Sequence, residues 1–113
     1  MTNSRDFIEQ ISFNSDGLVP VIAQDVDSRE VLMLAWMNKE SLRLSIETGR
    51  GTYFSRSRSK IWVKGEESGN VQHVVDIRRD CDSDALVMTV RQHGPACHTG
   101  NTTCFFQVLE VEV

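Results

Sequence analysis

The sequence lacks a membrane-spanning segment and a recognisable targeting segment. Its longest apolar run covers residues 31–37, whereas a membrane-spanning helix needs roughly 20 apolar residues. The first residues have neither an apolar core nor a cleavage pattern, so no signal peptide is expected. These absences predict a cytoplasmic protein that has no membrane partner.

Positive charge is also scarce. Twelve Lys and Arg residues stand against sixteen Asp and Glu, and the net charge is −4. General nucleic-acid binding needs surplus cations that displace counterions from the phosphate backbone. We therefore expect no nucleic-acid partner, although a local basic patch could still bind a small phosphorylated ligand.

No linker, low-complexity tract or internal repeat divides the 113 residues. The chain is 40% apolar and 25% charged, which is typical of a folded globular domain. Its length suits one ordinary domain and is too short for two. We expect a single domain over residues 1–113.

Local patterns predict an α+β or mainly-β domain with antiparallel pairing. Asn38 can cap a helix, because its side chain accepts a hydrogen bond from an early backbone N–H, and Gly49 can end that helix. A second short helix is expected over residues 7–11. The predicted strands cover residues 18–26, 31–37, 52–58, 61–64, 71–77, 85–91 and 105–111.

The three cysteines, Cys81, Cys97 and Cys104, contain no Cys-x-x-Cys pair and cannot all form disulfides within one chain. Three thiolates can bind zinc at about 2.3 Å each and leave a fourth position. Water there would make the site catalytic, because zinc lowers the pKa of bound water to about 7. His93 or His98 there would instead close a Cys₃His structural site. The spacing is compatible with both kinds of zinc site. It is also compatible with three cysteines that are merely small buried side chains.

His93 and His98 lie in a turn-rich loop beside Cys97. Loops often carry catalytic groups, and an imidazole is a natural proton carrier near neutral pH. The alternative for each histidine is a hydrogen-bonded loop residue. His73 is expected to be a strand residue that faces solvent or a neighbour.

Asp80, Asp82 and Asp84 alternate with Cys81 and Ser83. If this segment is extended, the carboxylates share one face and Cys81 points to the other. Oxygen ligands suit Mg²⁺ or Ca²⁺, whereas thiolates suit zinc. One short segment could therefore present two metals of different character, and the alternative is a solvated acidic turn.

Residues 55–65 gather four of the twelve cationic side chains around one tryptophan. In a continuous strand they would share a face, which a Ser-rich turn near residues 57–60 would interrupt. Cationic side chains and hydroxyls bind phosphate oxygens, and an indole can stack on a base. The alternative is a solvated hairpin whose tryptophan packs in the core. The candidate substrate-binding residues are Arg56, Arg58, Lys60, Trp62 and Lys64.

Five segments together resemble the phosphoribosyl-AMP cyclohydrolase family of histidine biosynthesis, in its single-function form. They are VPVIAQD (19–25), VLMLAWMN (31–38), TYFSRSRSKIWVKGEESGNVQ (52–72), DCDSDA (80–85) and QHGPACHTGNTTCF (92–105). The last two, in this order and spacing, are highly specific. The resemblance extends over residues 18–106.

The resemblance implies a hydrolase that opens the adenine ring of 1-(5-phosphoribosyl)-AMP at the N1–C6 bond with zinc-activated water. It implies zinc on Cys81, Cys97 and Cys104 and Mg²⁺ on the three aspartates. His98 or His93 would deliver a proton, and the basic segment together with Mg²⁺ would meet the two phosphates. The alternative is a non-enzymatic Cys₃His structural-zinc module that binds a nucleotide.

The resemblance also implies a homodimer with zinc at the subunit interface, where Cys81 of one chain joins Cys97 and Cys104 of the other. The fold would be a mixed, barrel-like β core with short helices, interlocked in the dimer.

Overall fold

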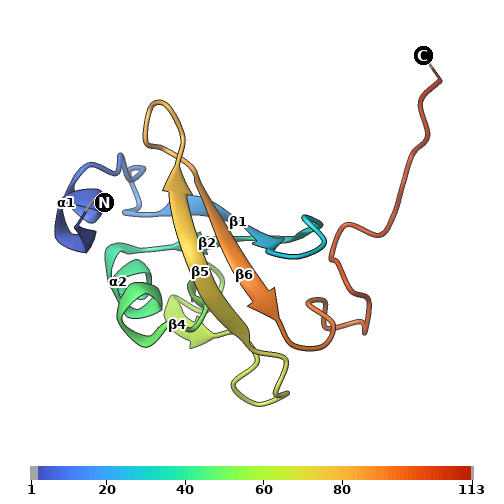
Figure 1. Cartoon of the computed structure of the whole chain (residues 1–113). Coiled ribbons are helices and arrows are strands. Elements are labelled where there is room, and N and C mark those ends of the chain that lie inside the picture. The colour runs from blue at the N-terminus through green and yellow to red at the C-terminus, as the bar shows by residue number, and fades with distance from the viewer. Residues whose placement is uncertain (1–2, 113) are drawn as a thin grey trace.

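The computed structural model describes residues 3–112, which form two helices, a four-stranded sheet and a separate two-stranded hairpin (Figure 1). The arrangement is α+β, as predicted. Neither described helix has the length and apolar content needed to cross a membrane. In chain order the elements are α1 (Ser4–Glu9), β1 (Val19–Asp25), β2 (Val31–Met37), α2 (Lys39–Thr48), β3 (Thr52–Ser55), β4 (Lys60–Val63), β5 (Gln72–Arg79) and β6 (Leu86–Gln92).

The four-stranded sheet has the order β2-β1-β6-β5. β1 and β2 are antiparallel, as are β5 and β6, but the central strands β1 and β6 are parallel. The prediction of antiparallel pairing is therefore correct for the two hairpins and wrong for the central pair. Parallel strands need a long crossover connection, and here β2, α2, the β3–β4 hairpin and β5 lie between them in the sequence.

The barrel-like core expected from the resemblance is not seen in residues 3–112. β2 and β5 remain the two edges of an open sheet, and β3 pairs only with β4. Barrel closure requires a hydrogen-bonded ladder between the first and last strands. The described chain instead packs α2 and the β3–β4 hairpin beside β2.

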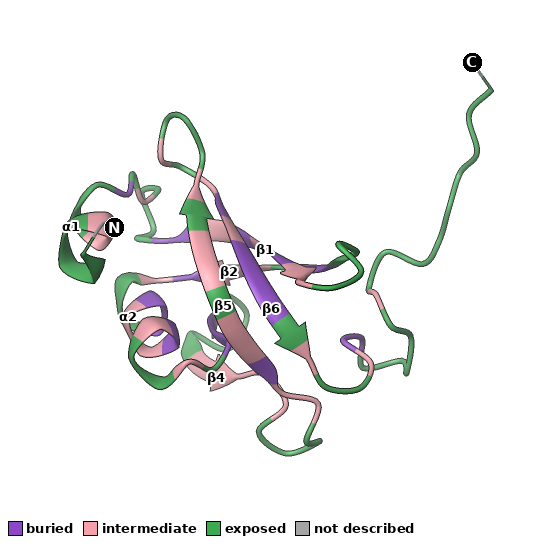
Figure 2. Ribbon diagram, in the orientation of Figure 1, coloured by how far each residue is buried: buried purple, intermediate pink, exposed green. Residues whose placement is uncertain are grey.

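The core lies on one face of the sheet, where alternate residues of the two central strands are buried. Val21 of β1 and Met88 of β6 are fully inaccessible, and Leu42 of α2 and Tyr53 of β3 join the same cluster. Burial runs along most of β6, and the strand becomes exposed near its end, at Arg91 (Figure 2). Packing in the core therefore holds β6 in place, and a loop lies at each of its ends.

The helix predicted after Asn38 is confirmed. Asn38 accepts a hydrogen bond from Ser41 N, Ser41 Oγ accepts one from Asn38 N, and Gly49 adopts a left-handed φ of 71°. Such reciprocal caps satisfy backbone groups that a helix start leaves free. The helix expected over residues 7–11 is found as α1, shifted towards the N-terminus and capped by Asn3.

Two strand predictions need correction. The strand expected over residues 52–58 ends at Ser55, because residues 56–59 form a turn in which Ser59 has a φ of 51°. The strand expected over residues 105–111 is wrong, since this segment pairs with none of the described strands. It leads away from the body of the protein (Figures 1 and 2). A strand is stable only when a neighbour completes its hydrogen bonds.

Candidate metal and substrate site

The acidic residues lie in the turn that joins β5 to β6. Asp80 Oδ1 accepts hydrogen bonds from Asp84 N (3.0 Å) and Ala85 N (3.3 Å), which bends the segment back on itself. The segment is thus a turn and not the extended stretch considered above. Even so, one carboxylate oxygen from each of Asp80, Asp82 and Asp84 lies within 4.8 Å of the others, and all three side chains are exposed.

The crowding of these carboxyl groups changes the pKa of Asp84. Hydrogen bonds with Asp82 and Asp80 raise the pKa of Asp84 to about 6. A carboxyl group gains a proton in this way when nearby negative charges disfavour its ionised form. A divalent cation would remove the same repulsion, so the turn has the charge and donor atoms that suit Mg²⁺.

Two of the three cysteines meet in the loop that follows β6. Cys97 is buried, and its thiol contacts that of Cys104. The backbone holds the pair in place, because Cys104 N donates to Leu32 O (2.7 Å) at the start of β2. Thr99 Oγ1 donates to Cys97 Sγ at 3.0 Å.

The two thiols differ in acidity. Hydrogen bonds from the side chain and backbone of Thr99 lower the pKa of Cys97. Partial desolvation of the sulfur raises the pKa of Cys104, and contact with Cys97 raises it further. The charge of Lys64, whose ammonium group donates to Ala96 O, favours the thiolate of both cysteines. Thiolates, not thiols, bind zinc, so this environment prepares Cys97, and not Cys104, as a metal ligand before the metal binds.

Cys81 is separate from this pair. It is exposed in the acidic turn that enters β6, whereas Cys97 and Cys104 follow the end of that strand in the chain. The two loops leave β6 at opposite ends (Figure 1). A strand of this length spans roughly 20 Å. Within residues 3–112 the predicted three-cysteine set is therefore not assembled by one chain.

The basic segment forms the β3–β4 hairpin, whose turn carries Arg56 and Arg58. The Arg56 guanidinium lies over the Trp36 ring, 4.6 Å from its centroid. A groove of about 550 Å³ opens here, lined by Ala35, Trp36, Phe54, Ser55, Arg56, Ser57 and Trp62. Two neighbouring hollows include Arg58 and Lys60. The hairpin thus combines aromatic faces with exposed cations, as a nucleotide phosphate site needs.

Trp62 and Lys64 differ in their position relative to this groove. Trp62 lines the groove but also packs on buried Tyr53, with ring centroids 5.0 Å apart. It therefore combines the predicted binding role with the predicted core role. Lys64 lies beyond the end of β4 and points to the thiol loop, so it links the two parts of the site.

The two loop histidines occupy different environments. The ring of His93 meets that of His73 edge to face, with centroids 5.0 Å apart. His73 is thus a strand residue that faces a neighbour, as expected. His98 is exposed and follows Cys97 directly in the chain, which leaves its imidazole free to meet a ligand at the thiol pair.

Sequence reasoning missed several supporting residues. A hydroxyl two positions after a cysteine in a turn was the available signal for Thr99. No such signal was available for the buried series of hydrogen bonds that links Tyr53, Gln72 and Gln92. Tyr53 Oη donates to Gln72 Oε1, and Gln72 Nε2 donates to Gln92 Oε1 at 2.9 Å. These bonds fix the last residue of β6 and hence the start of the thiol loop.

The donor atoms fit the two metals expected from the sequence. The thiol pair supplies two soft ligands of a tetrahedral zinc site, and the acidic turn supplies hard oxygen ligands suited to Mg²⁺. The third thiolate cannot come from the same chain in this arrangement.

Comparison with known proteins gives a consistent result. A family model described as phosphoribosyl-AMP cyclohydrolase matches residues 33–106, well over half of the chain. Phosphoribosyl-AMP cyclohydrolase of Halorhodospira halophila is 56% identical over 91% of this chain and 72% of its own length. That of Roseobacter denitrificans is 60% identical over 87% and 77%, and that of Archaeoglobus fulgidus 57% over 89% and 94%. All the candidate site residues lie within the matched range.

Proposed function

The chain belongs to the phosphoribosyl-AMP cyclohydrolase family, hydrolases of histidine biosynthesis, and we propose that it opens the adenine ring of 1-(5-phosphoribosyl)-AMP with zinc-activated water. The overall reaction adds the oxygen of water to C6 and breaks the N1–C6 bond. The carbon becomes a carboxamide and N1 receives a proton. The protein must therefore hold C6 near a water molecule and supply a proton at N1.

One observation carries this proposal. A thiol pair lies beyond one end of β6, an acidic turn with the third thiol lies at the other, and a cationic groove lies on the β3–β4 hairpin, which Lys64 connects to the thiol loop. A two-fold symmetric pair of chains can place the acidic turn of one copy at the thiol pair of the other. We propose a homodimer in which Cys81 of one chain shares zinc with Cys97 and Cys104 of its partner.

The chain's own residues have distinct tasks in this site. Bound zinc would act as a Lewis acid that lowers the pKa of a water molecule. Thr99 and Lys64 favour the thiolate of Cys97 and so prepare it as a ligand. His98, exposed beside Cys97, would give a proton to N1.

The cationic hairpin would orient the substrate by its phosphates. Arg56 and Arg58 lie in the turn and Lys60 begins β4, and all three are exposed. Trp36 and Trp62 offer aromatic faces for a base in the same groove. Mg²⁺ on the three aspartates would neutralise further phosphate charge.

A cytoplasmic location stays a prediction.

The direct test is turnover. Purified protein loaded with zinc and Mg²⁺ is mixed with phosphoribosyl-AMP, and ring opening is followed by the change in ultraviolet absorbance. Native protein should react, and removal of zinc by a chelator should stop the reaction until zinc is restored. A metal-replete dimer without turnover would contradict the proposal and favour the structural-zinc alternative.

A further inference from the structure

Gln72, the first residue of β5, places a polar amide in the apolar core. The residue is fully inaccessible to solvent, and its side chain contacts residues of β2, β3 and β6. A buried amide gives up its hydrogen bonds to water, whereas an apolar side chain of similar shape would fill the same space without that loss. The amide therefore needs an explanation beyond packing.

The polar atoms of this amide all have partners. Its oxygen, Oε1, accepts a hydrogen bond from Tyr53 Oη. Its nitrogen, Nε2, donates to Gln92 Oε1 at 2.9 Å and to Met33 Sδ at 3.4 Å. Gly51 provides the space for the amide, since a Cβ atom at that position would collide with Gln72 Oε1. The side chain is therefore held in one orientation.

The direction of these hydrogen bonds is fixed at the outer end of the series. Gln92 Nε2 donates to Asn70 O at 3.0 Å and to His93 O at 3.1 Å. Backbone carbonyl oxygens can only accept hydrogen bonds, so the amide nitrogen of Gln92 must face them and its oxygen must face Gln72. The series therefore runs in one direction, from Tyr53 in the core to the two carbonyl groups.

The two carbonyl groups lie where the thiol loop begins. His93 is the first residue after β6, and its backbone N donates to Val71 O at 3.0 Å. Gln92 thus ties the start of the loop to the segment before β5. Four residues after His93 the loop reaches Cys97, and metal sites need their ligands held within about 0.5 Å of the productive geometry. A change in the path of the chain at His93 would displace the sulfur of Cys97.

We propose that Gln72 is a positioning residue for the zinc site. Acting through Gln92, its amide sets the path of the thiol loop and so places Cys97 where it meets the metal. The inference rests on the proposed function in one respect, the assignment of zinc to Cys97. Replacement of residues that orient metal ligands typically lowers metal affinity about 10- to 100-fold.

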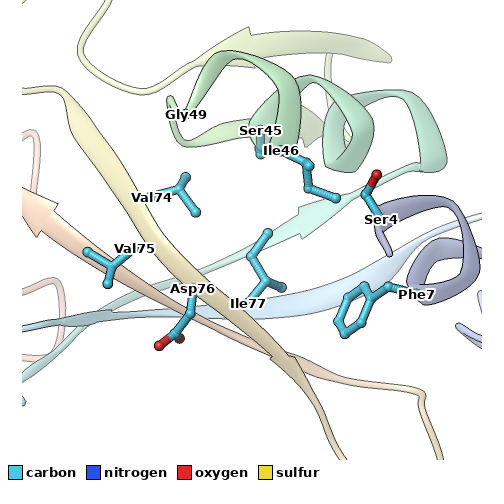
Figure 3. A pocket seen from close by; sticks show the side chains of 9 residues that line it. All are labelled: Ser4, Phe7, Ser45, Ile46, Gly49, Val74, Val75, Asp76 and Ile77. Carbon is cyan, nitrogen blue, oxygen red and sulfur yellow. The ribbon is translucent and has the colours of Figure 1, made fainter. Parts of the chain in front are cut away.

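The backbone of Gln72 is held independently of its side chain. Gln72 O accepts a hydrogen bond from Gly51 N at 2.9 Å, and Val74 N donates to Gly49 O at the same distance. Further along β5, Val74 and Ile77 point towards α2 (Figure 3), and both pack against the core. Loss of the amide should therefore leave β5 in place and alter the loop.

Gln72→Met tests the inference, because methionine has nearly the same length and fills the core without an amide. Metal-free native and variant proteins are compared by amide hydrogen exchange, followed by NMR. Exchange should become at least about tenfold faster at Ala96 and Cys97, whose N–H groups bond within the loop. It should change less at Val21, in the centre of the sheet. Equal acceleration at both places would indicate a general loss of stability, and this result or an unchanged loop would overturn the proposal.

Zinc affinity gives a second readout that needs no turnover. The dissociation constant, measured by competition with a chelator, should rise at least about tenfold in Gln72→Met. Cobalt(II) bound in place of zinc should show an altered visible spectrum, because that spectrum reports ligand geometry. Native zinc affinity in this variant would contradict the inference.

Ser41→Ala is the matched control. Ser41 is also fully buried and hydrogen-bonded, but it caps α2. Its replacement should lower the melting temperature and leave zinc affinity unchanged. An equal loss of zinc affinity in Ser41→Ala would mean that any loss of core stability weakens the metal site, which would overturn a specific role for Gln72.

Gln92→Glu isolates the outer end of the series and leaves the core untouched. The carboxylate can still accept from Gln72 Nε2, but it cannot donate to the carbonyls of Asn70 and His93. It should accelerate loop exchange and weaken zinc binding as Gln72→Met does, and it gives the answer even if Gln72→Met does not fold. A Gln92→Glu protein with native loop exchange and native zinc affinity would overturn the proposal.

Turnover is measured on the same samples, so that this inference and the proposed function can fail separately. A protein whose loop and zinc affinity depend on Gln72 but which never reacts contradicts the proposed function alone. A reactive protein whose loop and zinc affinity are unchanged by both substitutions contradicts only this inference.

Discussion

Cys81 and Cys97 lie at opposite ends of strand β6, the first in the turn that enters it and the second in the loop that follows it. Sulfurs that share a zinc ion lie about 4 Å apart, since each Zn–S bond is about 2.3 Å. The rise of an extended strand makes the separation along β6 roughly five times larger. The three cysteines can meet at one metal only if two chains contribute.

Shared zinc predicts complementation between inactive variants. Cys81→Ser and Cys97→Ser proteins should each lose zinc and activity. When they are mixed in equal amounts and allowed to exchange subunits, half of the dimers carry one chain of each kind. One of their two sites is intact, so about a quarter of native activity should return. Zinc content and turnover should recover together.

The matched control is a mixture of Cys97→Ser with Cys104→Ser. Both changes affect the same half of the site, so every site in every dimer remains defective. If the first mixture also stays inactive, the zinc site lies within a single chain. Activity from the control mixture would show that Cys97 and Cys104 of one zinc site come from different chains.

The acidic turn should make metal-free stability depend on pH. Because the folded-state pKa of Asp84 is raised to about 6, the folded chain holds this proton more tightly than the unfolded chain does. The stabilising contribution is present below the ordinary carboxyl pKa and is lost as pH rises through about 6. Near neutral pH, Asp84→Asn should therefore raise the melting temperature of the metal-free protein.

The same change should abolish the stabilisation that Mg²⁺ gives to the native protein, because it removes a ligand charge. Calorimetry with and without Mg²⁺ measures both effects. Asp16→Asn, an exposed residue outside the turn, is the control. Equal stabilisation of native and Asp84→Asn protein by Mg²⁺ would exclude Asp84 as a ligand.

His98 and His93 should differ in their contribution to catalysis. His98→Ala should lower kcat about 10²- to 10⁴-fold, the usual contribution of a positioned acid or base, and should leave zinc content unchanged. His93→Ala is the comparison, since the ring of His93 is already engaged with that of His73, and its effect on kcat should be smaller. If His98→Ala instead releases zinc and unfolds the protein, the imidazole is a structural ligand.

The basic hairpin should act on substrate affinity. Arg58→Ala removes a charged contact to phosphate, typically about 1.5–3 kcal/mol, so KM should rise roughly ten- to a hundredfold. Arg5→Ala, on exposed α1, should leave KM unchanged. Steady-state kinetics at constant ionic strength makes the comparison, and a fall in kcat at constant KM would contradict a role in ground-state binding.

Local chemistry made part of this structure predictable. Asn38 and Gly49 set the ends of α2 through hydrogen bonds within a few residues, so sequence alone located that helix. The strand over residues 105–111 was wrong because its pattern shows suitability for a strand but not the presence of a partner. The parallel pairing of β1 with β6 has no local signature.

The candidate site also combines features that the local sequence predicts with features that depend on distant parts of the chain. The spacing of Asp80, Asp82 and Asp84 was sufficient to predict a cluster, since neighbours in a short segment stay close in either a strand or a turn. A strand was predicted between Cys81 and Cys97, over residues 85–91, but the spacing of the cysteines could not show that this strand keeps the two thiols apart. The buried hydrogen bond between Tyr53 and Gln72 joins strands that are distant in sequence, so it became visible only in the fold.

The parallel contact between β1 and β6 also determines when the protein can fold. Val21 lies opposite Leu86, so the centre of the sheet joins an early segment of the chain to a late one. Such long-range pairing slows folding, because a large loop must close before any contact forms. On the ribosome β1 must wait for β6 to emerge, and the thiol loop emerges later still.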